Sequence, residues 1–197
     1  MPKLLLASSS PYRRQLLERL GLPFTTTSPE VDESPGVDEA PAALAERLAI
    51  SKALALAPKT PQPLLIIGSD QVASLDGRPL GKPGDHHRAT EQLRAASGQR
   101  VTFYTGLCLY DARTGLHRSH CERFYVHFRP LTDAQIEAYL TKEAPYDCAG
   151  AFKMEALGIR LFERLEGEDP NALIGLPLIA LTDMLLEAGV DPLLSQP

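Results

Sequence analysis

The stretch LLIIGSDQVASLDGRPLGKP, residues 64–83, contains the features that decide the fold of this chain. Leu64–Ile67 is an apolar run typical of a strand that is buried on both faces. Gly68, the next residue, permits another group to approach the backbone closely. Because ligands of α/β proteins bind beyond the carboxyl ends of such strands, we expect Asp70 to follow the end of this strand and to face a crevice.

A lysine follows this acidic residue after a turn signal at Asp76-Gly77. Lys82 lies between Gly81 and Pro83, in a constrained loop. An acid and a base so close in sequence suggest a site for a metal ion and phosphate, although a surface aspartate and a solvated lysine would give the same pattern. The stretch is not a P-loop, because Gly77 to Gly81 encloses three residues rather than four and Pro83 stands where Ser or Thr would bind magnesium.

The bulk composition indicates one globular domain over residues 1–197. Hydrophobic residues make up 44% and charged residues 23%, and the net charge of -5 argues against a general affinity for nucleic acid or an anionic membrane. No apolar run approaches membrane-spanning length and the N-terminal run is too short for a signal peptide, so we expect a cytoplasmic protein. Cys108, Cys121 and Cys148 form no close pair, which fits free thiols in a reducing compartment.

Two cationic side chains fall on the apolar faces of expected helices. Ser10 and Pro11 are typical of a helix start, which is also a natural anion site, and Arg13 continues the core-facing stripe of that helix. A second helix begins at Pro41, and Lys52 interrupts its apolar face. We expect both cations to meet anions, although Arg13 could instead reach solvent or a structural carboxylate and Lys52 could reach the rim of the protein.

An acidic segment over residues 29–39 separates these two helices. Such a cluster is usually solvated. If it folds over the crevice, however, Glu30 or Glu33 could join Asp70 in holding a divalent cation through hard oxygen ligands.

Local patterns predict the remaining elements. Thr105-Gly106 suggests a bulge or a close ligand approach inside a strand, while His117, His120 and Cys121 match no standard spacing of zinc ligands. Small residues in the loop over 148–155 would also allow a ligand to approach. We expect strands over 3–7, 24–27, 101–110 and 158–167, another strand ending near 128, helices over 85–96, 132–142 and 177–188, and a loop over 168–171.

Six motifs along the chain together resemble the Maf family: ASSSPYRRQLL, PEVDE, GSDQVASLDGRPLGKP, TGL, CAGAF and NALIGLPL. The resemblance implies an α/β fold similar to that of the inosine-triphosphatase family, in which a mixed twisted sheet with flanking helices forms two lobes around a cleft. It also implies a nucleoside-triphosphate pyrophosphatase that hydrolyses the bond between the α and β phosphates with a divalent metal cation, Mg or Mn. A homodimer is common among Maf proteins.

The resemblance further implies roles for individual residues. Asp70 would be the catalytic proton acceptor, and Glu30 and Asp70 would hold the metal. The residues in contact with the substrate would be Ser8, Arg13, Lys52 and Lys82.

Three positions depart from the general family pattern and suggest which base is bound. Tyr12, Gln71 and Glu155 stand where many Maf proteins carry Arg, Thr and Gln, and this set is similar to the YceF-like branch that acts on 7-methyl-GTP. Methylation at N7 gives guanine a positive charge, so an aromatic face and a carboxylate suit it. The alternatives are a Maf enzyme that prefers dTTP or UTP, and a regulator of cell division that binds a nucleotide without hydrolysing it.

Overall fold

A computed structural model describes residues 2–194 and shows a seven-stranded mixed sheet in the order β2-β1-β3-β5-β6-β7, with β4 paired to β3. β1 runs parallel to β2 and β3, and every other pair is antiparallel. This confirms the mixed α/β fold class expected from the sequence. The strands are β1 (Lys3–Ala7), β2 (Phe24–Thr26), β3 (Leu64–Leu75), β4 (Arg78–Leu80), β5 (Arg100–Asp111), β6 (Leu116–Phe128) and β7 (Phe162–Glu166).

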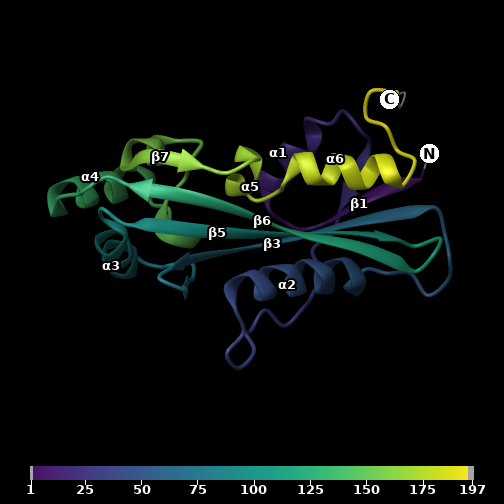
Figure 1. Ribbon diagram of the computed structural model, residues 1–197, viewed down its shortest axis with the longest axis horizontal. Coiled ribbons are helices and arrows are strands. Elements are labelled where there is room, and N and C mark those ends of the chain that lie inside the picture. The colour runs from purple at the N-terminus through teal and green to yellow at the C-terminus, as the bar shows by residue number, and fades with distance from the viewer. Residues whose placement is uncertain (1, 195–197) are drawn as a thin grey trace.

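Helices cover both faces of the sheet and divide it into two lobes. Figure 1 shows α2 on one face and α6 on the other, with α3, α4 and β7 at the end of the sheet far from both termini. One apolar cluster joins β1, α1 and α6, and another joins α3, α4 and β7. The helices are α1 (Pro11–Glu18), α2 (Pro41–Ala55), α3 (His86–Ala96), α4 (Asp133–Glu143), α5 (Pro170–Ile174) and α6 (Leu178–Glu187), and short 3-10 turns span Ala149–Ala151 and Leu157–Leu161.

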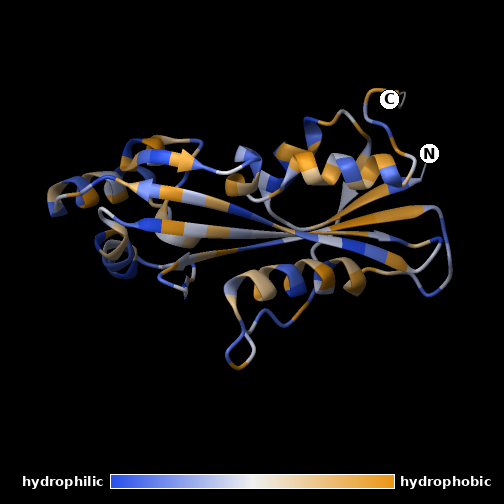
Figure 2. Cartoon of the chain, in the orientation of Figure 1, coloured by the Kyte–Doolittle hydropathy of each residue, from blue (hydrophilic) through white to orange (hydrophobic). Residues whose placement is uncertain are grey.

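The long strand β3 connects the two lobes, and it corrects the expected position of Asp70. The apolar first part of β3 is coloured as hydrophobic in Figure 2, but the strand does not end after it. It continues through Asp70 to Leu75 because β5 pairs with it from Leu65 to Ser74. Asp70 therefore lies in the middle of a strand and not beyond its carboxyl end.

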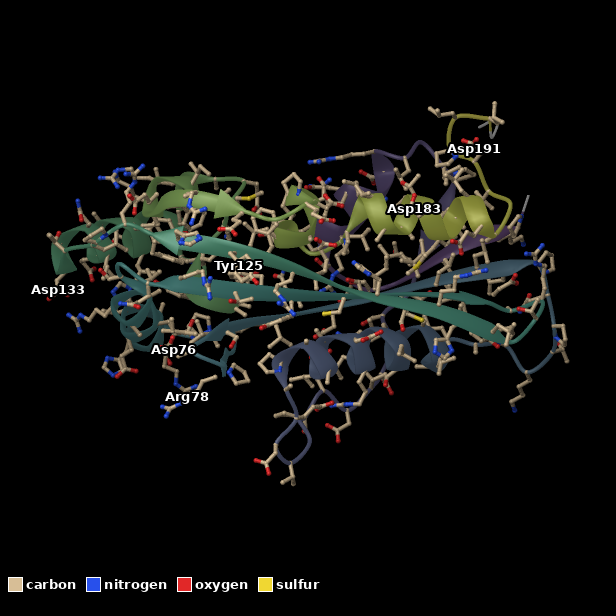
Figure 3. The ribbon with its side chains drawn as sticks, viewed as in Figure 1. Asp76, Arg78, Tyr125, Asp133, Asp183 and Asp191 are labelled. Carbon is tan, nitrogen blue, oxygen red and sulfur yellow. The ribbon has the colours of Figure 1, made fainter. Side chains whose placement is uncertain are left out.

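A gap along one edge of β3 provides the crevice instead. The parallel partner β1 ends at Ala7, opposite Gly68, and the antiparallel partner β4 begins to pair only at Ala73. Residues 69–72 of β3 therefore have no strand on that side, and the carboxyl ends of β1 and β4 approach the gap from opposite directions. The turn that leads into β4 carries Asp76, and Arg78 is the first residue of β4; both are labelled in Figure 3.

Two glycines allow α2 to pack directly on the sheet. A Cβ atom at Gly68 would lie 2.1 Å from the carbonyl oxygen of Ala49, and one at Gly106 would lie 2.1 Å from that of Ala45. The close approach predicted at Gly68 is thus made by helix backbone. The prediction for Thr105-Gly106 was wrong in both of its forms, because β5 keeps an unbroken register there and the group that approaches Gly106 is α2.

The C-terminal third of the chain differs from expectation in two segments. Residues 157–161 form a 3-10 turn, so only the second half of the strand expected over 158–167 exists as β7. The expected loop over 168–171 contains the start of α5, whose N-terminus is capped by the carboxylate of Asp169. Among residues 2–194 no helix is long and apolar enough to cross a membrane, and no cluster of three or more His, Cys, Asp or Glu side chains is placed to hold a metal.

Candidate active site

A cleft of about 740 Å³ opens at the gap in the edge of β3. Its size is within the range of small-molecule sites, about 300–1,000 Å³. It brings together the ends of β1 and β4, the start of α1, the end of α5, one face of α2 and loops from both lobes. The residues that line it are 7–13, Ser28, Pro29, Glu33, Pro35, the α2 side chains Leu44, Leu48 and Lys52, then 70–72, 79–82, Phe103, 147–149, 152–155 and 173–174.

The centre of the cleft is an ion-pair network around Lys52. Its Nζ lies 2.6 Å from Oδ1 of Asp70 and 2.7 Å from Oε1 of Glu33. The Lys52 and Asp70 side chains are only 10% and 12% exposed, whereas that of Glu33 is 61% exposed. The hydrogen bond from Lys52 lowers the pKa of Glu33 below its ordinary value. The prediction that Lys52 meets an anion is therefore confirmed, and both partners are carboxylates.

Arg13 enters the cleft from the first turn of α1. Ser10 caps this helix by accepting from the backbone N–H of Arg13, and Pro11 occupies the first helical position, as predicted. The side chain is fixed by a hydrogen bond of 2.9 Å from its Nε to the carbonyl oxygen of Gly175. Burial lowers the pKa of Arg13, while Asp70 and Glu33 oppose that shift, so a guanidinium cation faces two carboxylates.

Of the three other residues predicted to bind substrate or metal, Ser8 and Lys82 line the cleft and Glu30 does not. Ser8 is buried just after β1 and Lys82 is exposed just after β4, and both line the cleft. Glu30 is exposed and is not among the lining residues. The acidic segment instead contributes Glu33, three residues further along, which the sequence pattern could not distinguish from Glu30 because a loop has no periodicity.

The cleft is also lined by two of the residues expected to contact a base. Tyr12 and Glu155 both line it, and Phe103 and Phe152 form part of its wall. The pKa of Tyr12 is raised, chiefly by burial, with smaller contributions from Cys148 and from other neighbours that include Glu155. Burial also raises the pKa of Cys148 to about 12, so its thiol stays protonated at neutral pH and is no nucleophile.

Gln71, the third predicted specificity residue, uses its amide differently. It lines the cleft, but its Nε2 donates to the carbonyl oxygens of Ala172 at 2.8 Å and Leu173 at 3.1 Å, and also to Oγ1 of Thr105. Nε2 thus has three acceptors within the protein for its two hydrogens, and the role of Gln71 in base specificity stays a prediction. Thr105 and Gly175 do not line the cleft but contact Gln71 and Arg13, and these two contacts were not predicted from the sequence. Side chains alternate between the two faces of a strand, so the sequence does predict that Gln71 and Asp70 point to opposite faces of β3. This alternation was the sequence signal that could have separated their roles.

Comparisons with known proteins show which family the sequence resembles. The family described as "Maf-like protein" matches residues 3–188. The protein named 7-methyl-GTP pyrophosphatase in Pseudomonas savastanoi pv. phaseolicola is 59% identical over 97% of this chain and 99% of its own. Proteins of the same name from Nitrosococcus oceani and Vibrio vulnificus are 56% and 54% identical, over 95% and 97% of this chain and 94% and 97% of theirs.

A solved structure of the Staphylococcus aureus Ham1 protein covers 95% of this chain and 99% of its own, with a TM-score of 0.49 and 12% identity. The family itself is established by the sequence match over nearly the whole chain and by the three relatives above. This chain belongs to the Maf family.

Proposed function

We propose that this protein is a nucleoside-triphosphate pyrophosphatase that converts 7-methyl-GTP to 7-methyl-GMP and pyrophosphate. The observation that carries the proposal is the arrangement of one cleft, with Arg13, Lys52 and Lys82 around Asp70 and an aromatic residue and a carboxylate, Tyr12 and Glu155, among the other lining residues. The three relatives described above carry the name of this activity.

The cationic side chains suit the triphosphate. Arg13 and Lys52 are both held in place by contacts within the protein, and Lys82 is an exposed cation on the opposite side of the gap. Fixed positive charges of this kind bind phosphate oxygens and neutralise the charge that develops on them during phosphoryl transfer. The first turn of α1 adds backbone N–H groups at an end of a helix that favours anions.

Asp70 is the group that would accept a proton from the attacking water. Lys52 holds one of its oxygens, Oδ1, which fixes the orientation of the carboxylate. A positioned carboxylate that takes the proton of a nucleophile is a form of general-base catalysis. No covalent intermediate is needed, because water attacks the α phosphorus and the bond from that phosphorus to the bridging oxygen breaks, which releases pyrophosphate.

The carboxylates of Glu33 and Asp70 fit a divalent cation. Each has one oxygen bound to Lys52, which leaves the other oxygen of each as a hard ligand. Mg²⁺ is commonly held by one or two carboxylates together with substrate phosphates, so two protein ligands are enough. When bound, such an ion supplies further charge neutralisation at the phosphates.

Tyr12 and Glu155 suit a methylated guanine. An aromatic face attracts the delocalised positive charge of the 7-methylguanine ring, and a carboxylate accepts hydrogen bonds from N1–H and the exocyclic amine. Uracil and thymine carry no positive charge and offer a single ring N–H without the adjacent amine.

The test is to measure pyrophosphate release from 7-methyl-GTP, GTP, dTTP and UTP in the presence of Mg²⁺ or Mn²⁺. We expect the highest kcat/KM with 7-methyl-GTP, and we expect Asp70→Asn to abolish most of the release per folded molecule, while the variant still folds because Lys52 keeps Glu33 as a partner. Near-normal turnover by Asp70→Asn would refute its role, and a preference for dTTP or UTP would refute the base assignment.

A further inference from the structure

Three polar side chains of the sheet, from β3 and β5, donate hydrogen bonds to the C-terminal end of the short helix α5. The single hydroxyl hydrogen of Ser69 is shared between the carbonyl oxygens of Gly106 at 2.8 Å and Gly175 at 3.0 Å, and the hydroxyl of Thr105 donates to the carbonyl oxygen of Ala172 at 2.9 Å. The amide of Gln71 reaches the carbonyl oxygens of Ala172 and Leu173. Ser69 and Thr105 are fully buried, so these contacts are made without competition from water.

The contacts satisfy a need that every helix end creates. The last carbonyl groups of a helix have no partner within it, and a buried carbonyl without a partner is costly. α5 has only five residues, so most of its carbonyl groups fall in this class. Side chains of β3 and β5, which are distant in sequence, provide the missing donors. Figure 1 shows α5 at the middle of the sheet, between β7 and α6.

The same helix end fixes Arg13. The carbonyl oxygen of Gly175 accepts from both the hydroxyl of Ser69 and Nε of Arg13, the latter at 2.9 Å. Gly175 has φ 131°, a conformation that favours glycine, which aims this carbonyl without strain. A second link joins α1 to α5, because Nη1 of Arg19 donates to Oδ1 of Asn171 at 2.8 Å.

We propose that Ser69, Gln71 and Thr105 form a polar brace that positions Arg13 for the triphosphate through the end of α5. Ser69 and Gln71 flank Asp70 in the sequence and point to the opposite face of β3. One strand thus holds the catalytic carboxylate on one face and fixes a substrate-binding arginine from the other. Gln71 is a positioning residue in this arrangement and does not read the base.

The test is a double-mutant cycle between Ser69 and Arg13, and it rests on the proposed pyrophosphatase activity. Ser69→Ala removes one oxygen atom and should lower kcat/KM for 7-methyl-GTP about tenfold, because small displacements of a positioning group are costly to catalysis. Arg13→Ala should lower it further. In the Arg13→Ala background, Ser69→Ala should have less than a twofold additional effect, because it acts only through the arginine.

A purely structural role of Ser69 would give a different result, since its effect would multiply with that of Arg13→Ala. That outcome, or an unchanged kcat/KM in Ser69→Ala, would overturn the proposal. Activities are compared per folded molecule, from the thermal unfolding of each variant. If Ser69→Ala does not fold, Gln71→Met replaces it in the cycle with Arg13→Ala. An additional effect below twofold in the Arg13→Ala background again supports the proposal, and a multiplicative effect or an unchanged kcat/KM again overturns it. A wild type that releases no pyrophosphate from any nucleotide would instead refute the pyrophosphatase function itself.

Two further measurements separate positioning from base recognition. Thr105→Val, which loses the hydroxyl, should lower kcat/KM, whereas Thr105→Ser, which keeps it, should retain most of the activity. Gln71→Met should lower kcat/KM for 7-methyl-GTP and GTP by the same factor. A change of more than about fivefold in the ratio between these two substrates would show that Gln71 reads the base, and would overturn its assignment to the brace.

Discussion

The ammonium group of Lys52, on α2, lies 2.6 Å from the carboxylate of Asp70, in the middle of β3, and both side chains are buried. The contact ties the helix to the strand at the point where β3 has no neighbour on one edge. Burial makes each charge dependent on the other, because a buried ion that loses its partner is left uncompensated.

We therefore expect Lys52→Met to reduce both activity and stability. The free energy of unfolding at pH 7, measured in urea, should fall by roughly 3 kcal/mol, since Asp70 keeps its buried charge without a buried partner. Lys52→Met combined with Asp70→Asn should recover part of this loss, because the second change removes the uncompensated charge. A double variant that is as unstable as the sum of the two single variants would contradict the coupling.

The role of the acidic segment can be tested by comparing the same substitution at Glu33, which lines the cleft, and at Glu30, which does not. Glu33→Gln should lower kcat/KM and raise the Mg²⁺ concentration needed for half-maximal activity, because Glu33 contacts Lys52 in the cleft. Glu30→Gln, at an exposed position outside the lining of the cleft, should behave like the wild type. The reverse result in a titration with Mg²⁺ would assign the metal ligand to Glu30.

The ion pair of Glu33 also predicts a dependence of stability on pH. Its pKa in the folded protein lies below the ordinary value of 4.5. The folded state therefore binds this proton more weakly than the unfolded state, so the contribution to stability is present above about pH 4.5 and is lost as the pH falls through the folded-state pKa. Urea unfolding should show Glu33→Gln less stable than the wild type at pH 7, with the difference shrinking as the pH falls below 4.5 and through the folded-state pKa. A difference that grows in acid would contradict the sign of the shift.

Tyr12 and Glu155 should control which base is accepted. Glu155→Gln and Tyr12→Ala should each lower kcat/KM for 7-methyl-GTP by tenfold or more, about 1.4 kcal/mol, and change that for UTP much less. Steady-state kinetics with both substrates measures the ratio directly. An equal loss on both substrates would mean that these residues serve the cleft in general and not the methylated base.

Gly68 and Gly106 are expected to tolerate no side chain. Gly68→Ala or Gly106→Ala would place a methyl group against the backbone of α2, and the free energy of unfolding should fall by roughly 2–3 kcal/mol or more. Gly81→Ala is the control, because no atom lies within 4 Å of its Cβ position. Equal stability of Gly68→Ala and Gly81→Ala in urea would refute the close packing of helix on sheet.

Local sequence patterns were enough to predict the elements that carry the cations. Helical spacing placed Lys52 on the same face as Leu44 and Leu48, and all three are buried. The Ser10 and Pro11 pair correctly marked the start of α1 and so the position of Arg13. The helix expected over 132–142 is present as α4, and both hydrogen bonds of a capping box of Thr132 and Gln135 are present at its start. Each of these features depends on residues that are neighbours in the chain.

The features that could not be predicted depend on distant segments. β3 extends past Ile67 because β5 pairs with it over its length, and no local signal in GSDQVASL reveals that partner. α5 forms although it is only five residues long, because side chains of β3 and β5 satisfy its carbonyl groups. The homodimer expected from the resemblance stays a prediction, which the molar mass in solution would test.

The most direct test of the central claim is to identify the products formed from 7-methyl-GTP. The purified protein is incubated with this nucleotide and Mg²⁺, and the phosphorus-containing products are followed by ³¹P NMR, with Asp70→Asn as the matched variant. The account predicts 7-methyl-GMP and pyrophosphate in equal amounts from the wild type and little product from the variant. Formation of 7-methyl-GDP and phosphate, or no product from the wild type with any nucleoside triphosphate, would contradict it.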